Sequence, residues 1–364
     1  MNAPWFIDAH LDLSLNALEW NRDLTRPIGE IRAAEAGLTD KAGRGHGTVC
    51  FPEMRLGRVG LAVATQIGRV KCDDGFSPAA AWRSPAQAWA MTQGQLAWHR
   101  AMEEAGELAS IRTRPELEAH AALWRDAPPG STERLPIGCV RSLEGADSLI
   151  TLAHLERAYA DGLRAVGPAH YGPGIYARGT ESTGGFPPRG RELLKEMERL
   201  GMILDVTHLS DDCFWEAIKS YSGPIWASHH NCRALVPHQR QLADEQIRAL
   251  IERDAVIGVA LDGWMLVAGW VRDQTTPHSC ALRLEKVIEH IDHICQLAGD
   301  CLHIGLGSDL DGGFGREQTP CDLETIADVA RLPQLLLGRG GTAEDAENFA
   351  HGNFLRFLWR ALPR

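Results

Sequence analysis

The feature that most constrains the fold is a series of eight short apolar runs, each ending in glycine, polar or charged residues. Their centres are largely apolar without alternation, as in Met202–Val206 and Val256–Ala260. This pattern is typical of strands buried on both faces, which favours a parallel sheet. The runs are Trp5–Leu13, Gly60–Gly68, Leu135–Gly145, Leu163–His170, Gly201–Ser210, Pro224–His230, Ala255–Asp262 and Cys301–Gly312.

Segments with helical periodicity separate these runs. Asp211–Lys219 and the segment from Asp244 through Arg253 carry acidic residues near their starts, and Ala281–Leu297 has a regular apolar stripe. Strands that alternate with helices indicate βαβ units. Eight such units in about 300 residues predict an α/β fold, a (β/α)8 TIM barrel, with a doubly wound open sheet as the alternative.

We expect residues 1–364 to form a single domain. The gap between the first two runs, at about 14–59, contains the glycine-rich Ala42–Gly47 and is interpreted as an insertion over one end of the barrel. This cluster lacks the Gly-Lys-Ser/Thr ending of a phosphate-binding loop. A helical excursion is expected at about 78–125.

Composition and charge exclude several classes of protein. The chain has 37 Lys+Arg against 48 Asp+Glu and a net charge of −11, without a long basic run, so we expect no nucleic-acid partner. Nine scattered cysteines form no Cys-x-x-Cys pair, which favours a reducing compartment. The start shows no secretory signal pattern, and the most apolar stretch, Ile257–Trp270, is too short to span a bilayer. We therefore expect a cytoplasmic protein without a membrane partner.

Residue types that bind metals stand at six of the expected strand ends. His10 and Asp12 are two residues apart, so their side chains point to the same side of the first strand. In a TIM barrel these strand ends meet on the face that holds the active site. One such residue alone could be structural, but their convergence predicts a site for two divalent metal ions. The other residues are Glu144, His170, His208, His229, Asp309 and Asp311.

These residues stand in motifs that follow a characteristic order. The chain resembles the renal or membrane dipeptidase family of metallopeptidases, family M19 of the amidohydrolase superfamily. The resemblance extends from about Ile7 to Gly352–Leu355 and rests on the ordered set rather than on any single motif. The motifs are His10-Leu11-Asp12, Glu144-Gly145, Asp205–Ser210, Ser228–Asn231 and Gly307–Gly312.

The resemblance implies a TIM barrel with a binuclear zinc centre at the carboxyl ends of the strands. His10 and Asp12 would bind one Zn²⁺, His208 and His229 the other, and Glu144 would bridge the two ions. A hydroxide held between the ions would be the nucleophile, because paired metal ions lower the pKa of bound water and stabilise the charge that develops during hydrolysis.

The resemblance also implies roles for three further residues. Asp309 would take a proton from the water and pass it to the leaving amine. His170 would stabilise the developing oxyanion. Arg240 would hold the C-terminal carboxylate of the substrate, because a guanidinium can bind a carboxylate through two hydrogen bonds. Arg233 is the alternative for that carboxylate.

The sequence departs from the family pattern at two places. Leu11 stands where the family commonly has asparagine, and Ala260–Asp262 replaces an Asn-Phe-Tyr-like run. Asp262 could face a substrate ammonium group or could cap the following turn. These departures concern the choice of substrate rather than the metal ligands.

We therefore predict a zinc-dependent dipeptidase whose small dipeptide substrates include L,D-dipeptides, which the family accepts. One alternative is an amidohydrolase that acts on N-acyl amino acids or another amide. A second alternative is a metal-binding relative without catalytic activity. A homodimer is expected because such assemblies are common.

Overall fold

The structure is a computed structural model that describes residues 4–71, 81–128 and 130–364. Its strands form one sheet in which all pairings are parallel. The strands are β1 (Phe6–Leu11), β2 (Val59–Ile67), β3 (Leu108–Ser110), β4 (Ile137–Glu144), β5 (Leu163–Gly167), β6 (Ile203–Asp205), β7 (Ile225–Trp226), β8 (Ile257–Val259) and β9 (Ile304–Leu306).

Eight of these strands form a ring in the order β1, β2, β4, β5, β6, β7, β8 and β9, with β9 paired to β1. A single parallel bridge between Ala227 and Ile257 joins β7 to β8. Beside it, the amide of Gly258 donates a hydrogen bond of 2.8 Å to the carbonyl of Ala227. The predicted TIM barrel is therefore confirmed, and the doubly wound alternative is wrong.

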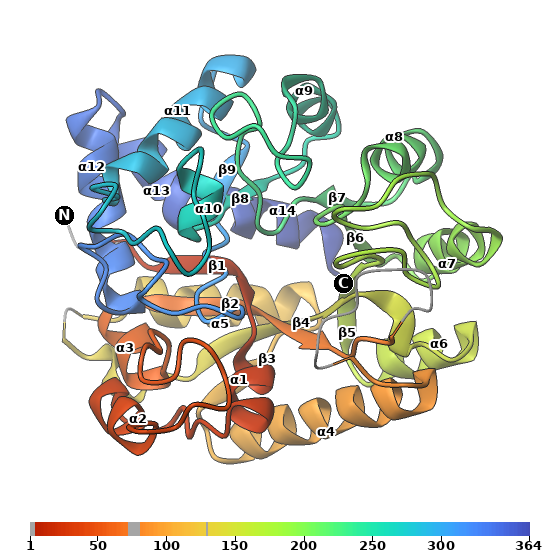
Figure 1. Cartoon of the computed structure of the whole chain (residues 1–364), viewed down its shortest axis with the longest axis horizontal. Helices are drawn as coiled ribbons and strands as arrows, with labels where there is room; N and C mark the ends of the chain where they lie inside the picture. Colours follow the sequence, from red (N-terminus) through yellow and green to blue (C-terminus); the bar gives the residue numbers. More distant parts are fainter. Residues whose placement is uncertain (1–3, 72–80, 129) are drawn as a thin grey trace.

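Helices lie around the outside of the ring (Figure 1). The three helical segments expected from periodicity correspond to α8, α9 and α11 and are confirmed. Short 3-10 turns occupy Thr132–Arg134, Ala146–Ser148 and Ile326–Arg331, and a π-helical turn occupies Asn348–Gly352. The α-helices are α1 (Leu13–Glu19), α2 (Ile28–Ala34), α3 (Phe51–Leu56), α4 (Pro85–Glu104), α5 (Arg114–Arg125), α6 (Leu152–Ala160), α7 (Pro188–Arg199), α8 (Asp211–Ser220), α9 (Asp244–Glu252), α10 (Gly263–Leu266), α11 (Glu285–Ala298), α12 (Leu332–Gly338), α13 (Ala343–Glu347) and α14 (Asn353–Ala361).

Local sequence explains where α8 begins. The Ser210 hydroxyl accepts a hydrogen bond of 3.2 Å from the amide of Cys213, and Asp211 and Asp212 occupy the first turn. A serine cap and acidic first-turn residues both stabilise a helix N-terminus. This fixes the chain just after His208, whose backbone φ of 67° lies in the left-handed region.

The expected helical excursion at about 78–125 contains a strand that the sequence did not indicate. Its residues 78–80 lie outside the described residues. In the remainder, α4 and α5 flank β3, whose three residues pair in parallel with the start of β4. The run Leu108-Ala109-Ser110 is too short and too weakly apolar to predict a strand. The segment at about 14–59, expected as an insertion, contains α1, α2 and α3.

Glycine allows the close approach that completes the ring. A Cβ atom on Gly258 would lie 1.9 Å from the carbonyl oxygen of Ser228, and one on Gly307 would lie 1.8 Å from the same oxygen. Neither position can therefore accept a side chain without moving the backbone. These two glycines hold β8 and β9 against the segment that carries His229.

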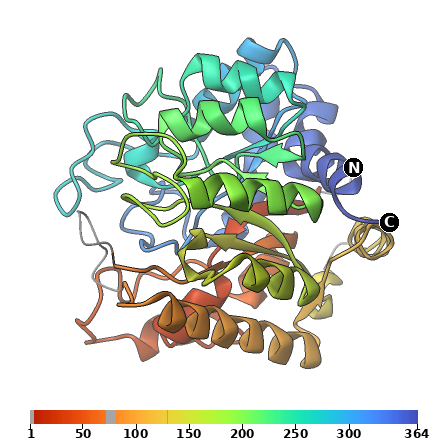
Figure 2. The same ribbon diagram turned by 90° about the vertical axis from the view of Figure 1, so that its right-hand side faces the viewer.

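The strands of the barrel are buried on both faces, one toward the barrel interior and the other toward the surrounding helices. Every residue of β1, β2 and β4 is buried, as the continuous apolar runs predict. Long connections gather at one end of the barrel (Figure 2). Within the described residues, none of the helices combines the length and the apolar character needed to cross a bilayer.

Candidate metal centre

Glu144, the last residue of β4, lies at the centre of the candidate site. Its Oε1 atom lies 3.2 Å from Nε2 of His208 and 3.5 Å from Nε2 of His229. His10 Nε2 lies 4.0 Å from the same oxygen, and His170 Nε2 lies 3.9 Å from Oε2. The ends of five strands thus bring four imidazoles around one carboxylate.

A second group of donors surrounds His10. Its Nε2 atom lies 4.0 Å from Oδ1 of Asp12 and 3.7 Å from Oδ1 of Asp309, which follows the neighbouring strand β9. Asp309 has a φ of 57°, in the left-handed region that residues other than glycine seldom adopt. Strained backbone of this kind is concentrated at functional sites, where the surrounding structure holds it in place.

Hydroxyl groups fix the rings of three histidines. Each hydroxyl lies within hydrogen-bond distance of Nδ1, so that Nε2 is directed toward the carboxylates. The pairs, with their Oγ–Nδ1 distances, are Thr65 with His10 (3.3 Å), Thr180 with His208 (2.9 Å) and Ser228 with His229 (2.9 Å). Metal-ligating histidines are usually oriented by such a bond from the second ring nitrogen.

The donor set fits divalent metal ions. Within the described residues, His10 Nε2 and Asp12 Oδ1 are buried and have no hydrogen-bond partner. Buried polar atoms without partners are costly, and a bound cation would satisfy both. Three groups have donor atoms within 4.8 Å of one another, namely His10 with Glu144 and His229, Glu144 with His170 and His208, and His10 with Asp12 and Asp309.

Burial controls the charge of these groups in the absence of a cation. It lowers the pKa of His208 and His229 well below the ordinary histidine value, so both are neutral imidazoles, the form that binds metals. Burial also opposes ionisation of Glu144, but electrostatic attraction to neighbouring histidines and arginines, His170 first, holds its pKa below the ordinary value. Burial and neighbouring carboxylates raise the pKa of Asp309 well above its ordinary value. A bound cation would reverse that rise.

The structure distinguishes between the two arginines that the sequence offers for binding a substrate carboxylate. Arg240 is buried in the wall of the pocket, and its Nη2 donates a hydrogen bond of 2.9 Å to the carbonyl of His229. Its Nη1 has no partner among the described residues. Arg233 instead forms an ion pair of 2.7 Å with Asp211. Arg240 is therefore the one of the two that faces the candidate centre.

Asp262 follows β8 and also lines the pocket. It is buried, its Oδ1 has no partner in the part of the chain that the structure describes, and burial raises its pKa to about 7. Although it precedes α10, its side chain makes no capping hydrogen bond to that helix. Asp262 therefore lines the pocket beside α10, where Trp264 partly opposes the rise in its pKa.

Asp311, two residues beyond Asp309, does not join the donor cluster. Its carboxylate accepts hydrogen bonds from the backbone amides of Thr48 and Val49 and forms an ion pair of 3.2 Å with Arg22. Asp311 thus anchors the segment between β1 and β2 to the barrel.

The site opens into a cavity of about 660 Å³, within the range of small-molecule sites. Besides the residues above, its wall includes Arg69, Trp264, Trp270 and Arg272, which sequence reasoning did not identify. Arg69 stands two residues after β2 and could have been found by extending the strand-end argument to basic residues. The two tryptophans and Arg272 belong to the connection after β8, where no local pattern distinguishes them.

The chain matches the sequence profile of the membrane dipeptidase family, peptidase family M19, over residues 2–362. An uncharacterized protein in the pqqA 5′ region of Klebsiella pneumoniae is 32% identical over 212 residues, which cover 56% of this chain and 74% of that protein. The dipeptidase tcpJ of Claviceps purpurea is 29% identical over 213 residues. That match covers 57% of this chain and only 43% of the fungal protein.

Solved structures show the same fold. The dipeptidase AC, a family M19 metallo peptidase, superposes with a TM-score of 0.80 at 22% identity and covers 100% of both chains. A metallo peptidase from Rhodobacter sphaeroides, solved with a phosphinate mimic of the dipeptide L-Ala-D-Ala, gives a TM-score of 0.78 at 21% identity, covering 99% of this chain and 100% of that chain. The chain therefore belongs to the membrane dipeptidase family of metal-dependent peptidases.

Proposed function

We propose that this protein is a zinc dipeptidase that hydrolyses small dipeptides, including L,D-dipeptides, at a centre for two metal ions. The arrangement of imidazoles and carboxylates around Glu144 is the observation that carries the proposal. The Rhodobacter sphaeroides structure with a mimic of L-Ala-D-Ala supports the choice of an L,D substrate. A homodimer and a cytoplasmic location remain predictions.

The ligands divide into two sets that share Glu144. His10 and Asp12 would hold one ion, and His208 and His229 the other. Oε1 of Glu144 lies within 4.0 Å of His10, His208 and His229, which supports a bridging position. When bound, the ions supply Lewis acidity, which polarises the scissile carbonyl and lowers the pKa of the attacking water.

Two residues beside the ligands would move protons and stabilise charge. Asp309 would accept the proton of the attacking water and deliver it to the leaving amine, since its carboxylate lies at the pocket wall beside His10. His170 would donate a hydrogen bond from Nε2 to the carbonyl oxygen as negative charge develops there. Its side chain is only 18% exposed, and the same nitrogen lies 3.9 Å from Glu144.

Arg240 would bind the free carboxylate at the C-terminal end of the substrate. Its Nη2 is already held by the carbonyl of His229, so the guanidinium is fixed in place before the substrate arrives. A positioned arginine aligns the scissile bond with the reacting groups and reduces the entropic cost of reaching the transition state.

The alternative substrate class is an N-acyl amino acid. Asp262 favours the dipeptide, because its buried Oδ1 has no hydrogen-bond partner among the described residues and would attract a free ammonium group. An acyl group in that position would leave this carboxylate unpaired, at a cost.

The experiment measures amine release by zinc-reconstituted protein from L,L- and L,D-dipeptides and from matched N-acetyl amino acids. Cleavage of the dipeptides that stops with a chelator and returns with zinc supports the proposal. Turnover of the acylated compounds alone would select the N-acyl amidohydrolase. No turnover of either class, with zinc bound, would select a catalytically idle metal-binding protein.

A further inference from the structure

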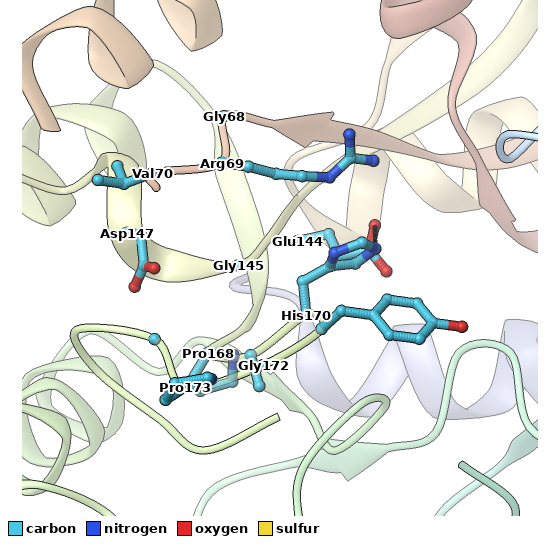
Figure 3. A pocket seen from close by; sticks show the side chains of 13 residues that line it. Gly68, Arg69, Val70, Glu144, Gly145, Asp147, Pro168, His170, Gly172 and Pro173 are labelled. Atoms are coloured by element: carbon cyan, nitrogen blue, oxygen red, sulfur yellow. Dashed lines mark ion pairs between the residues drawn. The ribbon is translucent and has the colours of Figure 1, made fainter. Parts of the chain in front are cut away.

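Arg69 is a charged residue of the pocket to which the proposed reaction gives no role. It follows β2 by two residues and lines the cavity together with Glu144 and His170. Its side chain extends toward the region of those two residues, whereas Asp147 points to the other side of the strand end (Figure 3). The guanidinium therefore belongs to the wall that a substrate would contact.

Among the described residues that line the cavity, Arg69 has no carboxylate partner, so its charge is not balanced by a direct ion pair. Its Nε is buried and has no hydrogen-bond acceptor there, and none of the carboxylates described lies within 4.0 Å of its guanidinium nitrogens. It acts on the site only over a longer range, since burial raises the pKa of Asp12 and the charge of Arg69 opposes that rise. A partly buried cation without a direct partner is costly unless an anion binds it.

The order of the strands places Arg69 opposite Arg240. In the ring β1, β2, β4, β5, β6, β7, β8 and β9, the strands β2 and β7 are four positions apart. Arg69 follows β2, and Arg240 lies beyond β7 and contacts the carbonyl of His229. The two guanidinium groups therefore face the metal-binding residues from opposite sides of the barrel mouth.

We propose that Arg69 binds a carboxylate in the side chain of the substrate's N-terminal residue, so that the enzyme prefers dipeptides that begin with aspartate or glutamate. This inference rests on the proposed function, in which Arg240 holds the C-terminal carboxylate and the scissile bond lies at the metal centre. The N-terminal residue then extends across the centre toward Arg69. A guanidinium repels the free ammonium of that residue but attracts an acidic side chain, which it can bind through two hydrogen bonds.

The test compares dipeptides that differ only in the charge of the first side chain. Aspartyl-alanine and asparaginyl-alanine have nearly the same shape, as do glutamyl-alanine and glutaminyl-alanine. For the zinc-loaded wild-type enzyme we expect kcat/KM to be at least about tenfold higher for the acid than for its amide. In Arg69→Met this ratio should fall at least about tenfold, and Arg69→Lys should retain part of it.

Arg272→Met is the matched control, because Arg272 also lines the cavity but lies in the connection after β8. It should keep the acid-to-amide ratio of the wild type. Binding of phosphinate mimics of the aspartyl and asparaginyl dipeptides, measured by calorimetry, should show the same ratios without turnover.

Two results would overturn the inference. An acid-to-amide ratio near one in the wild type would mean that Arg69 meets no substrate carboxylate. An equal loss on acid and amide in Arg69→Met would mean that Arg69 acts only on the charge of the metal ligands. Either result in an enzyme that hydrolyses L-Ala-L-Ala would reject this inference alone, whereas no hydrolysis of any dipeptide would reject the proposed function with it.

Discussion

Nε2 of His208 and Nε2 of His229 lie 3.3 Å apart, and both lie within 3.5 Å of the same oxygen of Glu144. Burial keeps both imidazoles neutral, so two ring nitrogens and one carboxylate oxygen converge in a small volume. This relationship fits a metal ion at this position and leads to the first prediction.

Glu144→Gln preserves the shape of the side chain but removes its charge. Because this carboxylate lies between both proposed ligand sets, we expect the bound zinc to fall below two ions per chain and dipeptide hydrolysis to fall at least about 100-fold, more than the loss typical of outer-shell changes. Metal analysis of dialysed protein and amine release measure the two effects. Full zinc content with full activity would contradict the bridging assignment.

Ser228→Ala removes the hydroxyl that lies 2.9 Å from Nδ1 of His229. We expect zinc affinity to decrease about 10- to 100-fold, because an unfixed ring binds the ion with the wrong tautomer or orientation part of the time. Competition with a chelating dye measures the affinity. Ser220→Ala, which removes an exposed hydroxyl on α8, is the control. Equal affinities in the two variants would show that Ser228 does not orient the ligand.

Asp309→Asn should lower kcat by about 10²- to 10⁴-fold, the usual contribution of a general acid or base. The zinc content should stay at the wild-type value, because Asp309 is assigned to proton transfer rather than to either ligand set. Steady-state kinetics with parallel metal analysis tests both expectations. If the variant loses zinc in proportion to activity, Asp309 is a ligand instead.

Arg240→Met should abolish discrimination between a dipeptide and its C-terminal amide. The wild type should prefer the free carboxylate by about 100-fold in kcat/KM, because a buried guanidinium loses a charged hydrogen bond with the amide. Arg233→Met removes the neighbouring arginine that pairs with Asp211 and should keep the preference. A preference that is lost in Arg233→Met but kept in Arg240→Met would reverse the assignment.

Asp147 gives a prediction for stability rather than activity. Burial raises its pKa to about 6, although its Oδ1 accepts a hydrogen bond of 2.8 Å from the amide of Ile175. Between about pH 4 and pH 6 the folded protein holds a proton that the unfolded chain has released, so wild-type stability falls as pH rises. Asp147→Asn keeps the acceptor and should gain about 2 kcal/mol relative to the wild type between pH 4 and pH 7.

Urea unfolding of both proteins at several pH values measures this difference. Comparing the variant with the wild type at each pH removes the contributions of the other titrating groups. A constant difference across the range would mean that Asp147 is ionised in the folded protein at pH 4.

The barrel could be predicted because its strands are buried on both faces, which leaves continuous apolar runs in the sequence. The site could be expected because parallel strands end on one face, so residues such as His10 and Glu144 must approach one another. The three-residue strand β3 could not be predicted, since its pairing depends on the start of β4 rather than on its own composition.

The hydroxyl groups that orient the histidines of the site also could not be predicted from the local sequence. Thr65 and Thr180 contact histidines that are 55 and 28 residues away in the chain, and no pattern around either threonine indicates this. Arg69 was missed because arginine was not counted among residues at strand ends. Residues that follow different strands come into contact only because the strands close into a ring, so the sequence around one residue does not indicate its partner.

The central claim is tested most directly by titrating zinc into chelator-treated protein and measuring hydrolysis of L-Ala-D-Ala as a function of bound zinc. We expect no hydrolysis without metal and a plateau of activity at two zinc ions per chain. Hydrolysis by the metal-free protein, or a full plateau at one ion per chain, would contradict it.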